Sequence, residues 1–214
     1  MTQLPSRRRG PGRPAADEPT PQLEQVLRLG LEAFAELGYE AASVRRLSAR
    51  LGMGHTFISD RYGTKEAFWK AVVEYALDPI RPEVAAALAD DGRGDLERLA
   101  AAARAFHRAA ARSPHSAHFA RLINYEAGAE SPRLTHLYAL MAPFNDVMKP
   151  LFDRLVADGT LRPMPWYLFH FLVTGPVGMY GQLPLARLFG RPDDTDDHDL
   201  MTDLILGGLL SQAP

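Results

Sequence analysis

Residues 43–66 decide the fold, and they read Ser43-Val-Arg-Arg-Leu-Ser-Ala-Arg-Leu-Gly-Met-Gly-His-Thr-Phe-Ile-Ser-Asp-Arg-Tyr-Gly-Thr-Lys-Glu66. Ser43 is a favourable N-cap for a first short helix, whose apolar side ends at Leu51. Gly52-Met53-Gly54 interrupts the helical pattern, and a second short helix is predicted from His55 to about Tyr62. Two short helices joined by a glycine turn are typical of a helix-turn-helix.

The second helix of this motif is predicted to turn a mostly polar face outward. Ile58 and Tyr62 are spaced to point inward, and Ser48 and Ala49 in the first helix are small enough for the two helices to cross. The outward residues are His55, Thr56, Phe57 and Ser59. Such a helix fits the major groove of DNA, where base edges carry a distinguishable pattern of donors and acceptors. The spacing is equally compatible with a helical hairpin inside a bundle, so both interpretations stay open at this point.

The rest of the chain has the apolar spacing of helices. Residues 1–19 are rich in proline, glycine and arginine and predict a flexible arm. Thr20-Pro21 is a helix start, and apolar residues then recur with helical spacing in segment after segment as far as Leu209. The predicted fold class is all-α: an N-terminal three-helix domain that contains the helix-turn-helix, followed by a C-terminal helical bundle, with nine to ten helices in total. The predicted domains are the arm at 1–19, the helix-turn-helix domain at 20–66 and the bundle at 67–214.

The charge is distributed unevenly along the chain. The 214 residues include 24 Lys or Arg and 26 Asp or Glu, for a net charge of −2. Residues 1–65 hold ten basic and seven acidic side chains and are net +3, whereas the remaining 149 residues are net −5. A basic N-terminal part on an acidic body favours DNA binding by the N-terminal part.

Several other classes of protein are disfavoured by the sequence. It has no cysteine, which excludes disulfides, thiolate metal sites and a cysteine nucleophile. The seven histidines have no carboxylates at ligand spacing, so no metal site and no cofactor are predicted. No glycine-rich phosphate loop or nucleophile elbow is present, and we do not expect an enzyme. The most apolar window, 166–180, is shorter than the roughly 20 residues of a membrane span, so we expect a cytoplasmic protein without membrane contact.

Blocks on both sides of the motif add a family resemblance. The first helix ends at Phe34-Ala-Glu-Leu-Gly-Tyr39, and the second short helix leads into Tyr62-Gly-Thr-Lys-Glu-Ala-Phe68. With these blocks, residues 22–75 resemble the N-terminal domain of the TetR family of transcriptional regulators. Weaker similarity continues at Phe119–Glu126 and Ser131–Tyr138. The resemblance implies a homodimeric regulator, most simply a repressor, that binds a double-stranded DNA operator and responds to a small molecule.

The resemblance also implies which residues contact DNA. Arg45 lies where the family often has a basic residue that reaches a base or phosphate, and Lys65 begins the next helix, where it can hold a phosphate. The chain departs from the family pattern at Ser59, where a tyrosine is usual, and at Arg61, where a histidine or tyrosine is usual. The predicted DNA-binding residues are Arg45, His55, Thr56, Phe57, Ser59, Arg61, Tyr62 and Lys65, with Arg9 and Arg13 of the arm as minor-groove contacts. For the arm, a solvated tail is the alternative.

The resemblance implies that the C-terminal bundle encloses a cavity, and its apolar side chains favour an apolar or aromatic molecule. The candidate walls are Phe106, His107, Phe119, Leu122, Tyr125, Phe144, Met148, Phe152, Trp166, Phe169 and His170. Most apolar residues at helical spacing belong to a core, so we expect only about half of these to reach a ligand.

The dimer is predicted from residues 166–173, which are apolar on every face. A helix of this kind must be covered on both sides, by its own core and by a second subunit. The predicted interface residues are Phe171, Thr174, Gly178, Leu204 and Ile205. A single buried core helix is the alternative.

Three other functions remain as alternatives for the whole protein: architectural DNA binding through the arm alone, an enzyme and a pure interaction protein.

Overall fold

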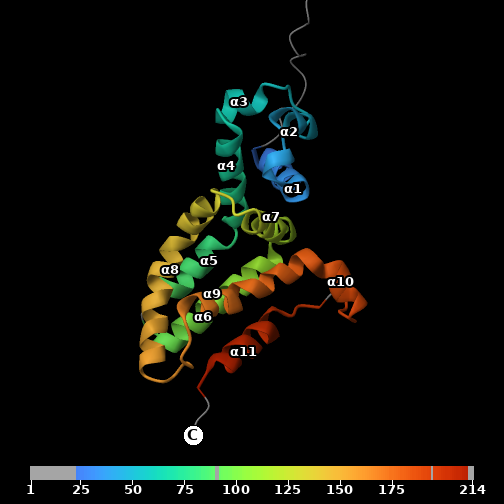
Figure 1. The fold of residues 1–214 in the computed structure, drawn as a ribbon. Helices are drawn as coiled ribbons and strands as arrows, with labels where there is room; N and C mark the ends of the chain where they lie inside the picture. The colour runs from blue at the N-terminus through green and yellow to red at the C-terminus, as the bar shows by residue number, and fades with distance from the viewer. Residues whose placement is uncertain (1–22, 90–91, 194, 212–214) are drawn as a thin grey trace, which may run out of the picture.

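The computed structural model describes residues 23–89, 92–193 and 195–211, and this part of the chain is all-α (Figure 1). Its elements are α1 (Leu23–Ala41), α2 (Val44–Arg50), α3 (Phe57–Tyr62), α4 (Lys65–Leu77), α5 (Arg81–Ala89), α6 (Asp95–Arg112), α7 (Ser116–Gly128), α8 (Leu134–Ala157), α9 (Trp166–Thr174), the 3-10 segment η1 (Gly175–Gln182), α10 (Leu183–Leu188) and α11 (His198–Leu209). Because α9, η1 and α10 follow one another without a break, the described chain has ten separate helical segments. The predicted fold class is confirmed.

Helices α1 to α4 form the N-terminal domain at the top of Figure 1, and local capping sets where they begin. The Ser43 hydroxyl accepts a hydrogen bond from the backbone N–H of Arg46 at 3.3 Å, which starts α2 as predicted. In the same way Thr64 accepts from the N–H of Ala67 at 3.0 Å and starts α4. The glycine turn at Gly52, with φ +68°, separates α2 from α3.

Gly38 breaks the first helix, where the sequence predicts its end. Its φ of +71° and ψ of 161° are not helical, and the chain makes one further turn before Ala41. A Cβ atom at this position would lie 2.2 Å from the Tyr125 ring of α7. Only glycine satisfies both the backbone conformation and this close approach of the body to α1.

Helices α1 to α4 share one core, and the predicted boundary between residues 66 and 67 falls inside α4. Phe34, Leu47, Ile58 and Phe68 are buried together with Trp69, from α1, α2, α3 and α4. Leu122 of α7 and Leu137 of α8 join the same core, so the body continues directly from this domain.

Helices α5 to α11 form the body. Apolar residues from α5, α6, α8, α9 and α11 fill its two cores, and α8 runs through Pro143 and Pro150 as one helix of 24 residues. The sequence did not predict α5 or α10 as helices. Figure 1 shows α10 projecting at the side of the body, with α11 below it. None of the described helices is both long and apolar enough to cross a membrane.

Candidate nucleic-acid interface and ligand cavity

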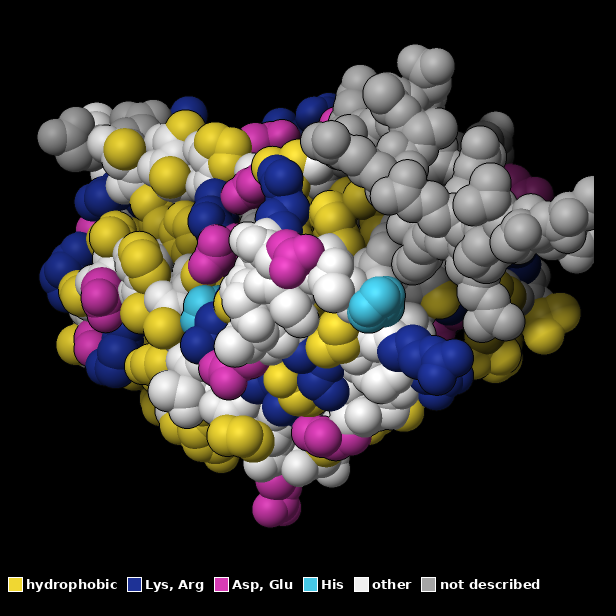
Figure 2. Space-filling model, turned by 90° about the horizontal axis from the view of Figure 1, so that it is seen from above, with side chains coloured by type: hydrophobic (Ala, Val, Ile, Leu, Met, Phe, Trp, Pro, Cys, Tyr) yellow, Lys and Arg dark blue, Asp and Glu magenta, His cyan; other side chains and the backbone are white. Residues whose placement is uncertain are grey.

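The helix-turn-helix presents its predicted outer residues to solvent. His55, Thr56 and Ser59 are exposed at the α2–α3 turn and on α3, while Ile58 of α3 is fully buried. The second helix is shorter than predicted, because α3 begins at Phe57 with Thr56 as its N-cap residue. Seen from above in Figure 2, the visible part of this end of the molecule carries Lys and Arg side chains with acidic side chains between them.

Two exposed arginines are available for DNA on this face. Arg45 on α2 and Arg61 on α3 form no hydrogen bond or ion pair with any residue that the structure describes. Their neighbours are already engaged: Arg46 donates to the Ala41 carbonyl at 3.1 Å, and Arg50 pairs with Glu36 at 2.7 Å. Arg45 and Arg61 are therefore the cations of the motif that can bind phosphate or a base without breaking a contact.

Lys65 has a structural role beside any contact with DNA. Its Nζ donates to the Tyr39 carbonyl at 2.9 Å and lies 3.9 Å from the centre of the Tyr39 ring. This contact fixes the first turn of α4 against the end of α1. Any phosphate bound by Lys65 would share its ammonium group with Tyr39.

The two aromatic residues of the predicted DNA contact are partly withdrawn from solvent. Phe57 packs edge-on against Tyr62, with ring centres 6.5 Å apart, and Tyr62 lies 4.8 Å from the Phe68 ring. Both side chains support the N-terminal core and are only partly exposed, and the Tyr62 hydroxyl is buried. Arg9 and Arg13 of the arm lie outside the described residues.

A buried ion pair within the body lies against the N-terminal domain. Arg133, just before α8, pairs at 3.0 Å with Glu126 of α7, whose side chain is 1% exposed. The Arg133 guanidinium also lies 3.5 Å from the centre of the Tyr39 ring and 5.8 Å from that of Trp69. Tyr39 therefore contacts Lys65 of α4 and Arg133 of the body at once.

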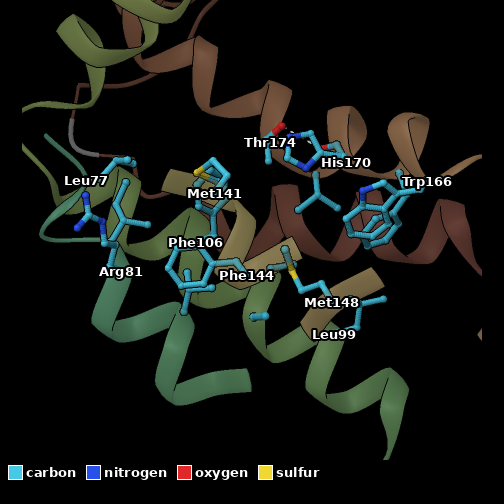
Figure 3. A pocket seen from close by; sticks show the side chains of 16 residues that line it. Leu77, Arg81, Leu99, Phe106, Met141, Phe144, Met148, Trp166, His170 and Thr174 are labelled. Atoms are coloured by element: carbon cyan, nitrogen blue, oxygen red, sulfur yellow. Dashed lines mark hydrogen bonds between the residues drawn. The ribbon is translucent and has the colours of Figure 1, made fainter. Parts of the chain in front are cut away.

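The body contains an apolar cavity between α4, α5, α6, α8 and α9, shown in Figure 3. Its volume is about 40 Å³, which holds only a few water molecules. Six of the predicted wall residues line it: Phe106, Phe144, Met148, Trp166, Phe169 and His170. Burial lowers the pKa of His170 below its usual value, so the ring is neutral at pH 7.

The other five predicted wall residues do not line this cavity, and each has a different role. The His107 ring bonds Thr202 and the Val173 carbonyl, both at 2.6 Å, and so ties α6 to α11 and α9. Phe119 and Leu122 pack in the cores next to the N-terminal domain, and Tyr125 covers Gly38. Phe152 is buried against Trp166, with ring centres 5.4 Å apart.

Sequence reasoning missed most of the wall contributed by α4, α5 and α6. The additional lining residues are Leu77, Ile80, Arg81, Val84, Leu99, Ala102, Ala103, Met141, Val173 and Thr174. Leu99 and Ala103 have the spacing of an apolar helix face, but nothing in that spacing says that this face borders a cavity. The one usable signal was Arg81, a charged residue between apolar neighbours.

An apolar surface covers α9, α10 and α11. On α9, Phe169 and Val173 are buried, whereas Tyr167 and Phe171 on the other side are 63% and 65% exposed. Leu204 of α11 is 69% exposed, and the other predicted interface residues, Ile205, Thr174 and Gly178, are partly buried. We call Tyr167, Leu168, Phe171, Leu172, Leu200 and Leu204 the α9–α11 face.

Within the described residues there is no group of three side chains that could hold a metal ion.

The structure thus combines a helix-turn-helix at the surface with an all-α body that has an internal apolar cavity. Residues 26–72 match the family model described as "Bacterial regulatory proteins, tetR family". The match covers the helix-turn-helix segment, which is therefore similar to the DNA-binding part of TetR family regulators. A comparison with curated protein sequences gives no significant match.

Solved structures share the fold over nearly the whole chain. The TetR family regulator PfmR from Thermus thermophilus is 22% identical, with a TM-score of 0.57 over 85% of this chain and 97% of that one. AibR in complex with isovaleryl coenzyme A and operator DNA is 18% identical, with a TM-score of 0.61 over 88% of this chain and 100% of that one. The hemolysin II transcriptional regulator HlyIIR is 18% identical, with a TM-score of 0.65 over 88% of this chain and 97% of that one.

Proposed function

We propose that the chain is a homodimeric, cytoplasmic repressor that leaves a palindromic operator when an apolar or aromatic small molecule fills the body cavity. Each subunit places α3 in the major groove, with His55, Thr56, Phe57 and Ser59 toward the bases. Arg45, Arg61 and Lys65 hold the phosphate backbone, Tyr62 supports the motif from the core, and Arg9 and Arg13 of the arm reach the adjacent minor groove.

The observation that carries the proposal is the position of α4. Its first residue, Lys65, lies beside the DNA-binding motif, and its last residue, Leu77, lines the cavity. The helix has 13 residues and is therefore about 20 Å long. Because α4 is one continuous helix, a shift of its end at the cavity also moves its other end at the motif.

The small cavity supports release by the ligand. A volume of about 40 Å³ is too small for a drug-sized molecule, which needs several hundred cubic ångströms. Binding must therefore move α4, α5, α6, α8 or α9 outward. A ligand that binds only the widened form favours that form by its difference in affinity, and this difference is what drives release.

The α9–α11 face supports the homodimer. About half of the apolar helix α9 is exposed to solvent in the single chain, and an exposed apolar patch of this kind is typical of a protein interface. Two-fold pairing through it places two motifs on one side, and a palindromic operator with half-sites about 34–36 Å apart, or a multiple of that, follows. The complex of AibR with isovaleryl coenzyme A and operator DNA supports a ligand and DNA as partners of this fold.

The test is operator binding by the full chain, measured by fluorescence anisotropy over a range of salt concentrations. Arg45→Ala is expected to weaken binding and to lower the salt slope by about one, because one phosphate contact is lost. Arg154→Ala is the matched control, since Arg154 lies on α8 and pairs with Asp95 at 2.6 Å. Equal affinity and slope for wild type and Arg45→Ala would refute this docking, and an unchanged slope after removal of residues 2–14 would refute the role of the arm.

A further inference from the structure

Arg81 is the one permanently charged side chain among the residues that line the cavity. It is the first residue of α5, and Figure 3 shows it at the edge of the cavity beside Leu77, at the opposite end from Trp166. The other polar groups of the wall are neutral: His170 is uncharged, and the Thr174 hydroxyl donates to the His170 carbonyl at 2.8 Å. The cavity surface is thus almost wholly apolar, with the Arg81 guanidinium at one edge.

The hydrogen bonds of Arg81 are weak and incomplete. Its Nη2 donates to the Glu74 carbonyl at 3.5 Å, and its Nη1 lies 3.7 Å from a carboxylate oxygen of Asp78. Both distances are at the long limit for such contacts. The Nε–H is buried and has no partner within the part of the chain that the structure describes. A buried donor without an acceptor is costly and unusual, unless a ligand supplies the acceptor.

The acidic residues near Arg81 leave room for another anion. Arg81 is 33% exposed and Asp78 is 66% exposed, so water screens the attraction between them. The carboxylate of Glu74 lies 3.8 Å from His136 and not on Arg81. Arginine binds a carboxylate more strongly than a neutral acceptor because the hydrogen bond is charge-assisted.

We infer that the effector is an elongated apolar molecule with a carboxylate at one end, and that this carboxylate binds Arg81. Its apolar part extends past Phe106 and Met148 toward Trp166. The inference rests on the proposed function of the cavity as the effector site. It also gives the ligand a direct effect on α4, because a carboxylate on Arg81 competes with Glu74 and Asp78, which both belong to the end of that helix.

The test is isothermal titration calorimetry of the full chain with three probes of one chain length: octanoate, methyl octanoate and octanol. Octanoate is expected to bind most tightly, and Arg81→Gln is expected to weaken it at least tenfold, which is about 1.4 kcal/mol. Methyl octanoate and octanol are expected to bind both proteins alike. Arg154→Gln, an arginine of α8 away from the cavity, is the matched control and is expected to leave octanoate binding unchanged.

A second readout places the probe. Trp166 lines the cavity whereas Trp69 is buried in the N-terminal core, so Trp166→Phe is expected to remove the change in fluorescence caused by octanoate. Equal octanoate affinity for wild type and Arg81→Gln, with both proteins melting normally, overturns the inference. If octanol binds as tightly as octanoate, the carboxylate preference is overturned while the cavity remains an effector site. If none of the three probes binds, the proposed class of ligand is wrong. Operator binding then tests the proposed function independently.

Discussion

Replacing Arg133 by leucine is expected to destabilise the protein strongly, because the ion pair between Arg133 and Glu126 is buried. Arg133 is 10% exposed and Glu126 is 1% exposed, with 3.0 Å between the charged groups. Arg133→Leu leaves a carboxylate in the interior without its partner, which typically costs about 3–5 kcal/mol. For a chain of this size each kcal/mol lowers the melting temperature by about 2–4 °C. We therefore expect a decrease of roughly 6–20 °C.

The double variant Arg133→Leu with Glu126→Leu distinguishes the cost of an unpaired buried carboxylate from a simple loss of packing. With both charges removed, the pair is replaced by apolar groups and most of the penalty disappears. The lost contact of Arg133 with the Tyr39 ring remains, and it is worth about 1–2 kcal/mol. The double variant is therefore expected to be more stable than Arg133→Leu alone.

The assay is thermal unfolding followed by circular dichroism, at one protein concentration because dimers melt in a concentration-dependent way. Arg154→Leu serves as the control, since its pair with Asp95 is largely exposed and contributes at most about 1 kcal/mol. The reasoning is refuted if Arg133→Leu melts within about 2 °C of wild type. It is equally refuted if the double variant is no more stable than the single one.

Three further predictions concern the backbone, pH and assembly. Gly38→Ala is expected to destabilise more than Gly52→Ala: both glycines have positive φ, with a penalty of about 1–2 kcal/mol, but only at Gly38 does the new Cβ meet the Tyr125 ring. Chemical denaturation measures both, and equal losses would contradict the contact. Burial lowers the pKa of His107, so the unfolded chain binds the extra proton first and the free energy of unfolding falls as the pH drops below about 6.5. Denaturation at several pH values should show a shallower fall for His107→Asn, and an unchanged slope would show that His107 does not contribute. Phe171→Asp on the α9–α11 face is expected to give a folded monomer in sedimentation velocity, and a persistent dimer would exclude this face as the interface.

The N-terminal domain could be predicted from the sequence because its signals are local. Ser43 as N-cap, the break at Gly38 and the glycine turn before α3 depend only on neighbouring residues. The sequence did not reveal α5, because Pro82 suggests the end of a helix. Proline in the first turn of α5 is instead favourable, since the N–H that it lacks has no partner there.

The cavity could be predicted only in part, because its walls depend on tertiary packing. Phe119 and Phe144 have the same apolar character and similar helical spacing, yet Phe119 fills the core and Phe144 borders the cavity. Which apolar face meets a neighbour and which meets an empty space depends on how α4, α5 and α6 are arranged. The contacts of Arg133 with Tyr39 and of Arg81 with Glu74 likewise join residues whose proximity no sequence pattern indicates.

The most direct measurement of the central claim is the selection of DNA from a random-sequence pool by the full chain at physiological salt. The account predicts an enriched palindrome with half-sites about 34–36 Å, or a multiple of one helical turn, apart. It also predicts that Arg45→Ala fails to enrich this sequence while the Arg154→Ala control enriches it. Recovery of sequences without two-fold symmetry, or equal enrichment by wild type and Arg45→Ala, would contradict it.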